Sequence, residues 1–394
     1  MNMPEGPYPG GSFSHNPSSI SVAQVSESDR LHQFRYIIFH LTPRVFVAHG
    51  LVAINVLVYV AMVVSGVDFY SPSAVDLIDW GANYGPLTLA GQLQRLLTSM
   101  FLHIGIVHIA LNMWVLWEIG PLAERLLGNL GFLFMYLIAG LMGSLASLYW
   151  NPELISAGAS GAIFGVVGAI LAFTMLQRRS IPVEAFSGIR SSMLAFVGYN
   201  LLFGFVLQAA KPNGIGIDMG AHLGGLLAGM ICGLILSQPL TLESGRRRWL
   251  RNAALLAVGV LMVGGSLKAM PAGPDDIQGE LQRFSDVERQ AIEAFNALGR
   301  KVNANEIDAQ AFAASVEKDV IAPWHEAHER FRSMKRVPQS KQSLVAQLLQ
   351  YMQLREDSFR LAVEAAREDS GDKLAQFQEK QTAAEALLKT LNDQ

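Results

Sequence analysis

Long apolar runs alternate with short polar segments over residues 45–267 of this 394-residue chain. Because a helix needs about 20 mostly apolar residues to cross a bilayer, these runs predict seven membrane spans. The spans lie at 45–64, 102–117, 132–149, 157–176, 193–208, 219–236 and 253–267. The second and fifth are short, so the pattern defines their ends least well. The predicted fold class is all-α: a polytopic membrane helix bundle with six core spans and a seventh.

Beyond Pro274 the pattern changes to charged, helix-favouring sequence with no further apolar run. Apolar residues recur there at intervals of three and four, which indicates amphipathic helices. They include Ile277, Leu281, Phe284, Ile292 and Phe295, and later Val345, Leu348, Met352 and Phe359. Pro323 and Pro338 are expected to separate these helices. A soluble helical C-terminal domain is therefore predicted at residues 273–394.

Composition and local bias divide the rest of the chain. Residues 1–30 are rich in Pro, Gly and Ser and are expected to form a disordered tail, from which no signal peptide is removed. The six-span core follows at 31–240 and the seventh span at 241–272. With 51% hydrophobic and 16% charged residues, the chain is expected to have a lipid bilayer as its partner and no nucleic acid. Disulfides are excluded by a single cysteine, Cys232.

Arginine accumulates on one side of the predicted spans. The residues are Arg30, Arg35 and Arg44 before the first span, Arg178, Arg179 and Arg190 after the fourth, and Arg246, Arg247, Arg248 and Arg251 after the sixth. Since cytoplasmic loops retain positive charge, we expect a cytoplasmic N-terminus and place His103, Ser160 and His222 near the outer face of the cell membrane. The C-terminal domain then lies outside, whereas a miscounted seventh span would place it in the cytosol.

Ser160 opens the fourth span within the sequence Gly158-Ala159-Ser160-Gly161. Small residues at such a position commonly serve close helix packing and nothing more. At a helix start, however, unpaired backbone N–H groups can stabilise an oxyanion formed at the serine. A serine also needs a base before it becomes a nucleophile. The interpretation of Ser160 therefore depends on a partner.

His222 opens the sixth span and is expected at the same depth as Ser160. Its neighbours on the same helical face are Gly225, Gly229 and Gly233. A smooth glycine face lets a second helix approach closely, which would bring the imidazole within hydrogen-bond distance of the serine. A polar residue near the membrane interface is the simpler interpretation of this histidine taken alone.

Further polar residues lie near these two. His108 and Asn112 share one face of the second span, and both can donate hydrogen bonds toward developing negative charge; a packing network between helices explains them equally well. His103 lies off that face, which favours a gating or packing role. Asp218 precedes His222 by one turn and is expected to cap the helix rather than orient the imidazole. A dyad is predicted rather than a triad.

Two weaker interpretations concern the same region. The loop between the fifth and sixth spans contains Pro212, Gly214 and Gly216. It fits a lid over the site or an ordinary turn. A metal site made by the three histidines is a minor alternative, because no carboxylate or thiolate is evident as a fourth ligand. We expect neither a metal nor an organic cofactor.

In combination these residues resemble the rhomboid intramembrane serine proteases. The resemblance covers about residues 95–233 and depends on the order of the motifs. They are His103, His108 and Asn112, then Gly158-Ala159-Ser160-Gly161, then Ala221-His222 with Gly225, Gly229 and Gly233. Each motif is weak alone, but the ordered set is specific to this family.

The resemblance implies a serine endopeptidase with Ser160 as nucleophile and His222 as general base and then general acid. His108, Asn112 and the serine backbone N–H would form the oxyanion hole. Phe164 would pack against the catalytic histidine. Supporting positions are His103, Gly158 and Gly225.

The resemblance extends to structural positions. Glu124-Arg125 is similar to a charged pair that follows the second span in the family. Arg95 matches an arginine of the first long loop, although Gln94 replaces a frequent tryptophan, which weakens the expected anchoring of that loop. The seventh span is similar to the six-plus-one arrangement. Residues 273–394 lie outside the resemblance, and their helices fit docking of a protein partner or plain self-packing.

The expected substrates are single-span or other membrane-anchored proteins, cut in or near a transmembrane segment where the helix unwinds. One alternative is a non-catalytic rhomboid-like protein that binds membrane helices, but such a protein is expected to lack the nucleophile or the base. A transporter is the second alternative. It is disfavoured because Glu118, Glu153 and Asp218 lie at span ends rather than at mid-membrane depth.

Overall fold

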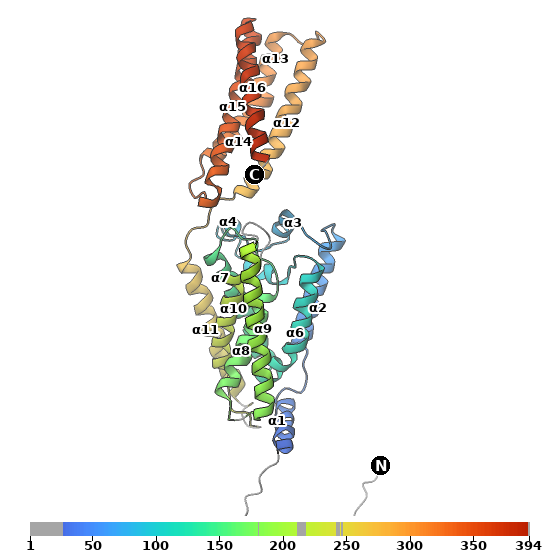
Figure 1. Cartoon of the computed structure of the whole chain (residues 1–394), viewed down its shortest axis with the longest axis vertical. Coiled ribbons are helices and arrows are strands. Elements are labelled where there is room, and N and C mark those ends of the chain that lie inside the picture. The colour runs from blue at the N-terminus through green and yellow to red at the C-terminus, as the bar shows by residue number, and fades with distance from the viewer. Residues whose placement is uncertain (1–26, 180, 211–217, 242–244, 246, 393–394) are drawn as a thin grey trace, which may run out of the picture.

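The computed structural model describes residues 27–179, 181–210, 218–241, 245 and 247–392. Its regular elements are helices, and they form two bundles stacked along the long axis of the molecule (Figure 1). The first bundle contains the predicted membrane spans and the second contains the C-terminal helices. The predicted fold class, an all-α multi-pass membrane bundle with a helical C-terminal domain, is confirmed.

Each predicted span overlaps one helix of the structure. The helices are α2 (Val47–Val64), α6 (Ile106–Leu127), α7 (Asn129–Trp150), α8 (Ser160–Leu176), α9 (Val183–Ala210), α10 (Met219–Leu236) and α11 (Arg248–Ala269). Within the described part of the chain, five of them are long and apolar enough to cross a membrane: α2, α6, α7, α10 and α11. The shorter α8 is an apolar helix of 17 residues.

The second span differs from its predicted range of 102–117. α6 starts later and continues to Leu127, and Pro121 lies inside it without ending it. The hydropathy pattern stops early because Glu118 and Glu124 interrupt it. The prediction that Glu118 lies at a span end is therefore wrong, since it lies inside α6. The Glu124 carboxylate is buried and accepts hydrogen bonds at 2.8–3.0 Å from three backbone N–H groups that open α2. A helix start with unpaired N–H groups stabilises such a carboxylate.

The pair Glu124-Arg125 therefore lies inside α6 rather than after it. Its second member donates from Nη1 to the carbonyl of Thr42, at 2.8 Å. Both charged groups tie the C-terminal end of α6 to the chain around the start of α2. The structural role implied for the pair by the resemblance agrees with these contacts, although its position relative to the span does not.

Short elements close the two ends of the membrane bundle. Between α2 and α6 lie α3 (Ala74–Asp79), α4 (Gly85–Thr88), α5 (Arg95–Thr98) and η1 (Ser99–Phe101). They cover the end that faces the C-terminal bundle, whereas α1 (Glu27–Leu41) lies at the opposite end (Figure 1). α1 begins within the range predicted as a disordered tail, and residues 1–26 lie outside the described part.

Glycine sets the spacing of the central helices. α8 is buried at every position from 161 to 174, and α10 packs against it backbone to backbone. A Cβ atom on Gly225 would lie 2.0 Å from the carbonyl oxygen of Gly161, and one on Gly229 would lie 2.0 Å from that of Gly165. Larger side chains are therefore excluded along this interface.

The C-terminal bundle consists of longer helices around an aromatic core. Its elements are α12 (Ile277–Asn303), α13 (Ala309–Val316), η3 (Glu317–Ile321), α14 (Ala322–Arg332), η4 (Gln339–Lys341), α15 (Gln342–Glu368) and α16 (Gly371–Asn392). Trp324 is fully buried, packs at a tilt against Tyr351 and edge-on against Phe359, and donates from Nε1 to the carbonyl of Met352 at 2.9 Å. Trp324, Tyr351 and Phe359 thus form an aromatic centre within this core.

The two prolines of this region behave differently. Pro338 precedes η4 and α15, so the predicted separation there is confirmed. The break predicted at Pro323 is wrong, because α13, the π-helical η3 and α14 follow one another without interruption. A proline ring clashes with the carbonyl four residues earlier. Here that position falls in the wide π turn of η3, which makes room for the ring.

Candidate active site

Ser160 and His222 meet at the end of the membrane bundle that faces the C-terminal domain. The serine is the first residue of α8, and the histidine lies in the first turn of α10. The Oγ atom of Ser160 lies 3.0 Å from Nε2 of His222. The hydroxyl can therefore donate a hydrogen bond to the ring nitrogen, which is the geometry that a base needs to take the serine proton.

The close approach of α8 and α10 produces this geometry. The carbonyl oxygen of Ala221 lies against Gly161, where an added Cβ would be 3.3 Å from it. The glycine contacts of the following turns hold both helices in this register. The first turns of the two helices therefore lie at one depth, and their polar side chains face each other.

Packing rather than a further hydrogen bond orients the imidazole ring of His222. Phe164 stacks on the imidazole with a centroid distance of 4.2 Å and an interplanar angle of 11°. Asp218 caps α10 instead, accepting from the backbone N–H of Ala221 at 2.8 Å, so the cap prediction is confirmed. Among the described residues, Nδ1 of His222 has no hydrogen-bond partner. The arrangement is a pair of residues without an orienting carboxylate.

His108 adjoins the same site through its contact with Gly158. The backbone N–H of Ile104 donates to Nδ1 of His108 at 3.3 Å, which favours the tautomer with its proton on Nε2. A Cβ atom on Gly158 would lie 2.7 Å from Cε1 of this ring, and the glycine has a φ of +137°. Both restrictions require glycine at this position.

Asn112 contacts His108 through a hydrogen bond, whereas His103 contacts it through ring packing. Nδ2 of Asn112 donates to the carbonyl of His108 one turn earlier, at 2.9 Å, which leaves its second N–H for another acceptor. His103 is fully buried, and its ring centre lies 5.3 Å from that of His108. His103 thus packs behind the site.

A short segment, residues 151–159, leads into Ser160 and is held by the loop between α2 and α6. Asn83 and Ser156 exchange two backbone hydrogen bonds of 2.9 Å each. The N–H of Gly85 donates to the carbonyl of Pro152 at 2.8 Å. We call this arrangement the Ser160 clamp. It fixes the path of the chain immediately before the serine.

Asn83 is the residue of the clamp that sequence reasoning missed. Its side chain is fully buried, donates from Nδ2 to the carbonyl of Ser144 at 2.9 Å and accepts from the hydroxyl of Thr88 at 3.0 Å. No sequence motif marks it, because its partners come from a neighbouring short helix and from α7. A lone asparagine in a loop gives no signal of this kind.

Arg95 anchors the same loop. The guanidinium is buried and donates from Nη1 to the carbonyls of Ile78 and Ala82, at 2.6 and 3.1 Å. The anchoring is present even though Gln94 replaces the tryptophan frequent in the family. Backbone carbonyls therefore provide the contacts that hold this part of the loop.

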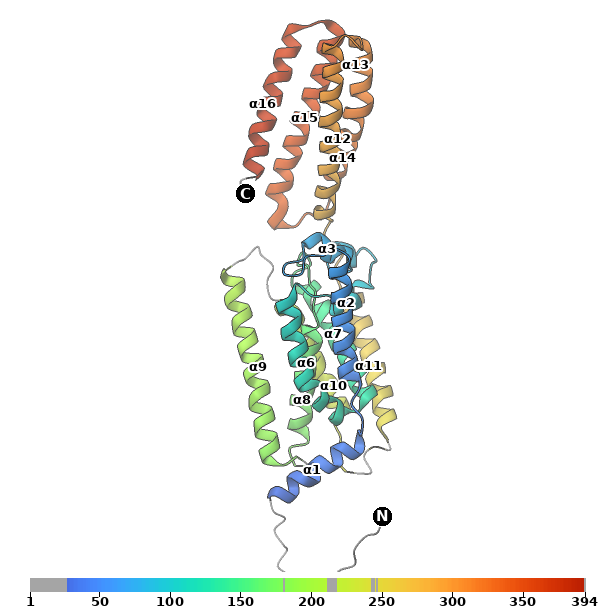
Figure 2. The same cartoon turned by 90° about the vertical axis from the view of Figure 1, so that its right-hand side faces the viewer.

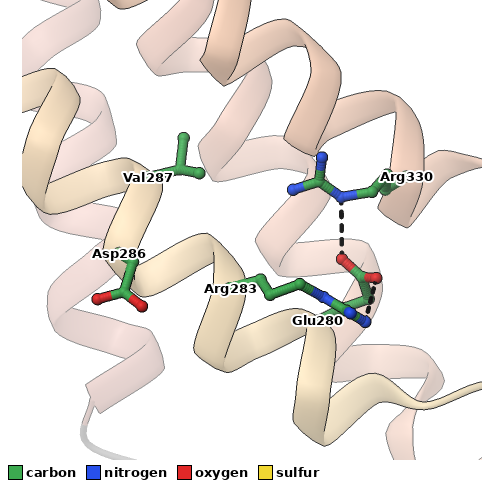
Figure 3. Close-up of a pocket in the computed structure, with 5 residues that line it drawn as sticks. All are labelled: Glu280, Arg283, Asp286, Val287 and Arg330. Carbon is green, nitrogen blue, oxygen red and sulfur yellow. Dashed lines mark hydrogen bonds and ion pairs between the residues drawn. The ribbon is translucent and has the colours of Figure 1, made fainter.

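The C-terminal bundle contacts the clamped segment directly. The hydroxyl of Ser340 donates to the Glu153 carboxylate at 3.0 Å. A shallow pocket of this bundle lies between α12 and α14, where Arg283 and Arg330 both bind the carboxylate of Glu280 (Figure 3). That pocket is on the C-terminal bundle and shares no residue with the Ser160 site.

Two further predictions from the sequence concern a lid and a metal site. The candidate lid residues Pro212, Gly214 and Gly216 lie outside the described residues. Within the described ranges, no group of three or more His, Cys, Asp or Glu side chains is placed to hold a metal ion.

Comparisons with known proteins agree on one family. A model of the rhomboid domain matches residues 90–239. The chain is 36% identical over 216 residues to Rhomboid protease GluP of Bacillus subtilis, covering 54% of this chain and 39% of that protein. It is 32% identical over 161 residues to the Putative rhomboid protease YdcA of the same organism, covering 39% of this chain and 74% of that protein.

A plant relative shows the same partial coverage. RHOMBOID-like protein 7 of Arabidopsis thaliana is 34% identical over 134 residues, which cover 34% of this chain and 42% of that protein. This chain thus spans about two fifths of the length of GluP and of the plant relative. The residues that the rhomboid-domain model matches lie in the membrane bundle and include Ser160 and His222.

Proposed function

Because the chain belongs to the rhomboid family, we propose that it is an intramembrane serine endopeptidase that uses Ser160 and His222. The proposed reaction is hydrolysis of a peptide bond in or near the transmembrane segment of a membrane-anchored protein. One observation carries the proposal: Ser160 Oγ lies 3.0 Å from His222 Nε2, at the opening turns of two helices.

The proposed reaction uses the two side chains in succession. Oγ of Ser160 attacks the scissile carbonyl carbon while its proton passes to Nε2 of His222. The histidine then gives that proton to the leaving amine, which leaves an acyl-enzyme. Water attacks the ester carbonyl, again losing a proton to the imidazole, and the serine is restored when the histidine returns it. Packing of Phe164 against the imidazole supports this role by limiting how the ring can turn.

The proposed oxyanion hole consists of the N–H of Ser160 and the side chains of His108 and Asn112. The serine N–H belongs to the first turn of α8, where no helical acceptor is available. The favoured tautomer of His108 carries a proton on Nε2, and Asn112 retains one amide N–H. Donors arranged in advance around developing charge stabilise a transition state most when water is excluded.

A reconstituted cleavage assay tests the dyad. Purified full-length protein in lipid vesicles is incubated with a single-span reporter whose transmembrane segment contains Gly and Ala, and cleavage is followed on gels. Wild type should cleave, whereas Ser160→Ala and His222→Ala should not. Ser156→Ala is the matched control, because Ser156 bonds to Asn83 through its backbone, and it should retain activity.

Two outcomes would count against the proposal. Cleavage by both dyad variants would exclude these residues as nucleophile and base. If wild type cleaves no reporter and a fluorophosphonate does not label Ser160, the chain is instead a rhomboid-like protein that binds membrane helices without cutting them.

We further propose that the N-terminus is cytoplasmic and that the site and the C-terminal domain face outward. The arginines at the far end of the membrane bundle support this orientation. Labelling of whole cells with a membrane-impermeant maleimide tests it on two exposed positions. Arg289→Cys on the C-terminal bundle should be labelled, whereas Arg35→Cys on α1 should react only after the cells are opened; the reverse pattern would invert the topology.

A further inference from the structure

Six arginine side chains are exposed at the end of the membrane bundle opposite Ser160. They are Arg30, Arg35, Arg44, Arg178, Arg179 and Arg247. We call this surface the basic end. α8 spans the distance between the two ends, with Ser160 as its first residue and Arg178 just beyond its last. α1 lies across the basic end, as a second view also shows (Figure 2).

Among the described residues, none of the six arginines forms an ion pair. In the C-terminal bundle, by contrast, Arg330, Arg360 and Arg367 are each paired with a glutamate. Six unpaired cations on one surface attract an anionic partner from outside the chain.

Aromatic side chains are exposed at the same level. They include Tyr36 on α1, Phe46 before α2 and Trp249 at the start of α11, which are 62%, 61% and 67% exposed. The rings of Tyr36 and Trp249, which have an apolar body and a polar group, favour the boundary between lipid tails and headgroups. Their position beside the arginines places the basic end at the depth of the lipid headgroups.

The orientation of α1 is fixed by its contacts with the bundle. Phe34 and Ile38 on one face are buried against it. The end of α1 is tied down by Arg248, whose Nη1 donates to the carbonyl of Leu41 at 2.6 Å. Arg35, which is exposed beside this buried face, is therefore held outward toward the surroundings.

We propose that the basic end binds the headgroups of anionic phospholipids, with α1 lying in the headgroup layer. The phosphate of an anionic lipid matches the paired N–H groups of a guanidinium. The neighbouring aromatic rings enter the outer part of the acyl layer. A zwitterionic headgroup provides the phosphate but no net charge to balance the arginines. This surface is separate from the proposed catalytic dyad and does not depend on it.

Electron paramagnetic resonance of spin-labelled lipids tests the proposal. Full-length protein is reconstituted in phosphatidylcholine vesicles with a trace of spin-labelled phosphatidylglycerol or phosphatidylcholine, and the motionally restricted fraction of each label is measured. Wild type should restrict the anionic label more, and the excess should shrink as salt is raised. In Arg30→Gln/Arg35→Gln/Arg178→Gln, the relative binding constant for the anionic label should fall about twofold or more.

Controls separate this effect from misfolding and from general charge. Arg289→Gln removes an exposed arginine of the C-terminal bundle and should leave the lipid preference unchanged. The melting temperature of the triple variant should match that of wild type. The proposal is overturned if wild type shows no preference for phosphatidylglycerol at low salt, or if a folded triple variant keeps the full preference. Loss of the preference on adding millimolar inorganic phosphate would also overturn it, since free phosphate would then be the ligand.

Discussion

Between α8 and α10 the membrane bundle is packed through glycine, whereas between α14 and α15 the C-terminal bundle is packed through aromatic rings. At the first interface, Gly229 leaves no space for a methyl group against the backbone of Gly165. At the second, Trp324 fills the core and is fully buried. The same chain thus builds one interface from its smallest residue and another from its largest.

The surroundings explain this difference. Lipid tails are as apolar as leucine, so burying large side chains between membrane helices gains little, and close backbone contact stabilises the pair instead. In water, removing large apolar surface from solvent is the main driving force. The outer surfaces follow the same rule, since Leu57 and Val260 are exposed on the membrane bundle while paired charges cover the C-terminal one. The two bundles should therefore be sensitive to opposite changes in side-chain size.

Making the aromatic core smaller should have the largest effect. Trp324→Ala should lower the stability of the C-terminal bundle by about 4 kcal/mol, since it removes a buried indole and leaves a cavity. Trp324→Phe keeps much of the ring and loses the hydrogen bond to the Met352 carbonyl, so its loss should be smaller. Hydrogen exchange of α12 and α15 in the full-length protein measures both. Equal losses for the two variants would mean that volume is not what stabilises this core.

Adding a methyl group at the glycine interface should cause the second-largest loss of stability. Gly229→Ala should destabilise the membrane bundle by about 3 kcal/mol, because its methyl group would overlap the carbonyl of Gly165 and force α10 away from α8. Gly264→Ala on α11 is the matched control, since an added Cβ there meets nothing within 4 Å. Thermal unfolding in detergent should show the loss for Gly229→Ala only. Similar melting temperatures for both variants would contradict glycine-dependent packing.

In the Ser160 clamp, the membrane bundle is held by buried side-chain hydrogen bonds of Asn83 rather than by glycine packing. Asn83→Ala should cost about 2 kcal/mol, because it leaves the Ser144 carbonyl and the Thr88 hydroxyl without their buried partner. The rate of fluorophosphonate labelling at Ser160 should fall as well, since the chain before the serine is less well held. Thr98→Ala, in the same loop but on its exposed side, is the control. Unchanged labelling in a folded Asn83→Ala variant would limit the clamp to a structural role.

Hydropathy was enough to predict the long apolar helices of the membrane bundle, and the glycine face of α10 was enough to suggest which helix lies beside it. These features are local, because they depend only on residues that are near one another in the sequence. The course of α6 beyond residue 117 was not predictable, since Glu124 is stabilised by N–H groups of a helix far away in the sequence. The role of Asn83 in the clamp was not predicted for the same reason, because its partner Ser144 is 61 residues away.

The uninterrupted helix through Pro323 illustrates a second limit. A proline predicts a helix break because its ring clashes with an earlier carbonyl, but the wider π turn of η3 avoids the clash. The core around Trp324 favours this solution, since it keeps α13 and α14 on the same aromatic cluster. Tertiary packing thus decides what a local rule cannot.

Removing a buried charge from the C-terminal bundle should have the smallest effect on stability. Burial alone would raise the pKa of Glu356, but hydrogen bonds from Arg360 and His328 and the charge of His325 outweigh it and lower the pKa below its ordinary value. A carboxyl whose pKa is lower in the folded state binds more protons when unfolded, so its stabilisation is present above the unfolded value of 4.5 and is lost as the pH falls through the folded value.

Glu356→Gln should therefore cost on the order of 1 kcal/mol at neutral pH, where the charged hydrogen bonds exist, and nothing at acid pH. Hydrogen exchange of α14 and α15 between pH 7 and pH 3, corrected for the intrinsic exchange rate, should show a smaller acid-induced loss of stability in the variant than in wild type. Glu326→Gln, which removes the exposed partner of Arg330, should keep the wild-type dependence. Parallel profiles for wild type and Glu356→Gln would show that charge at this position does not stabilise the aromatic bundle.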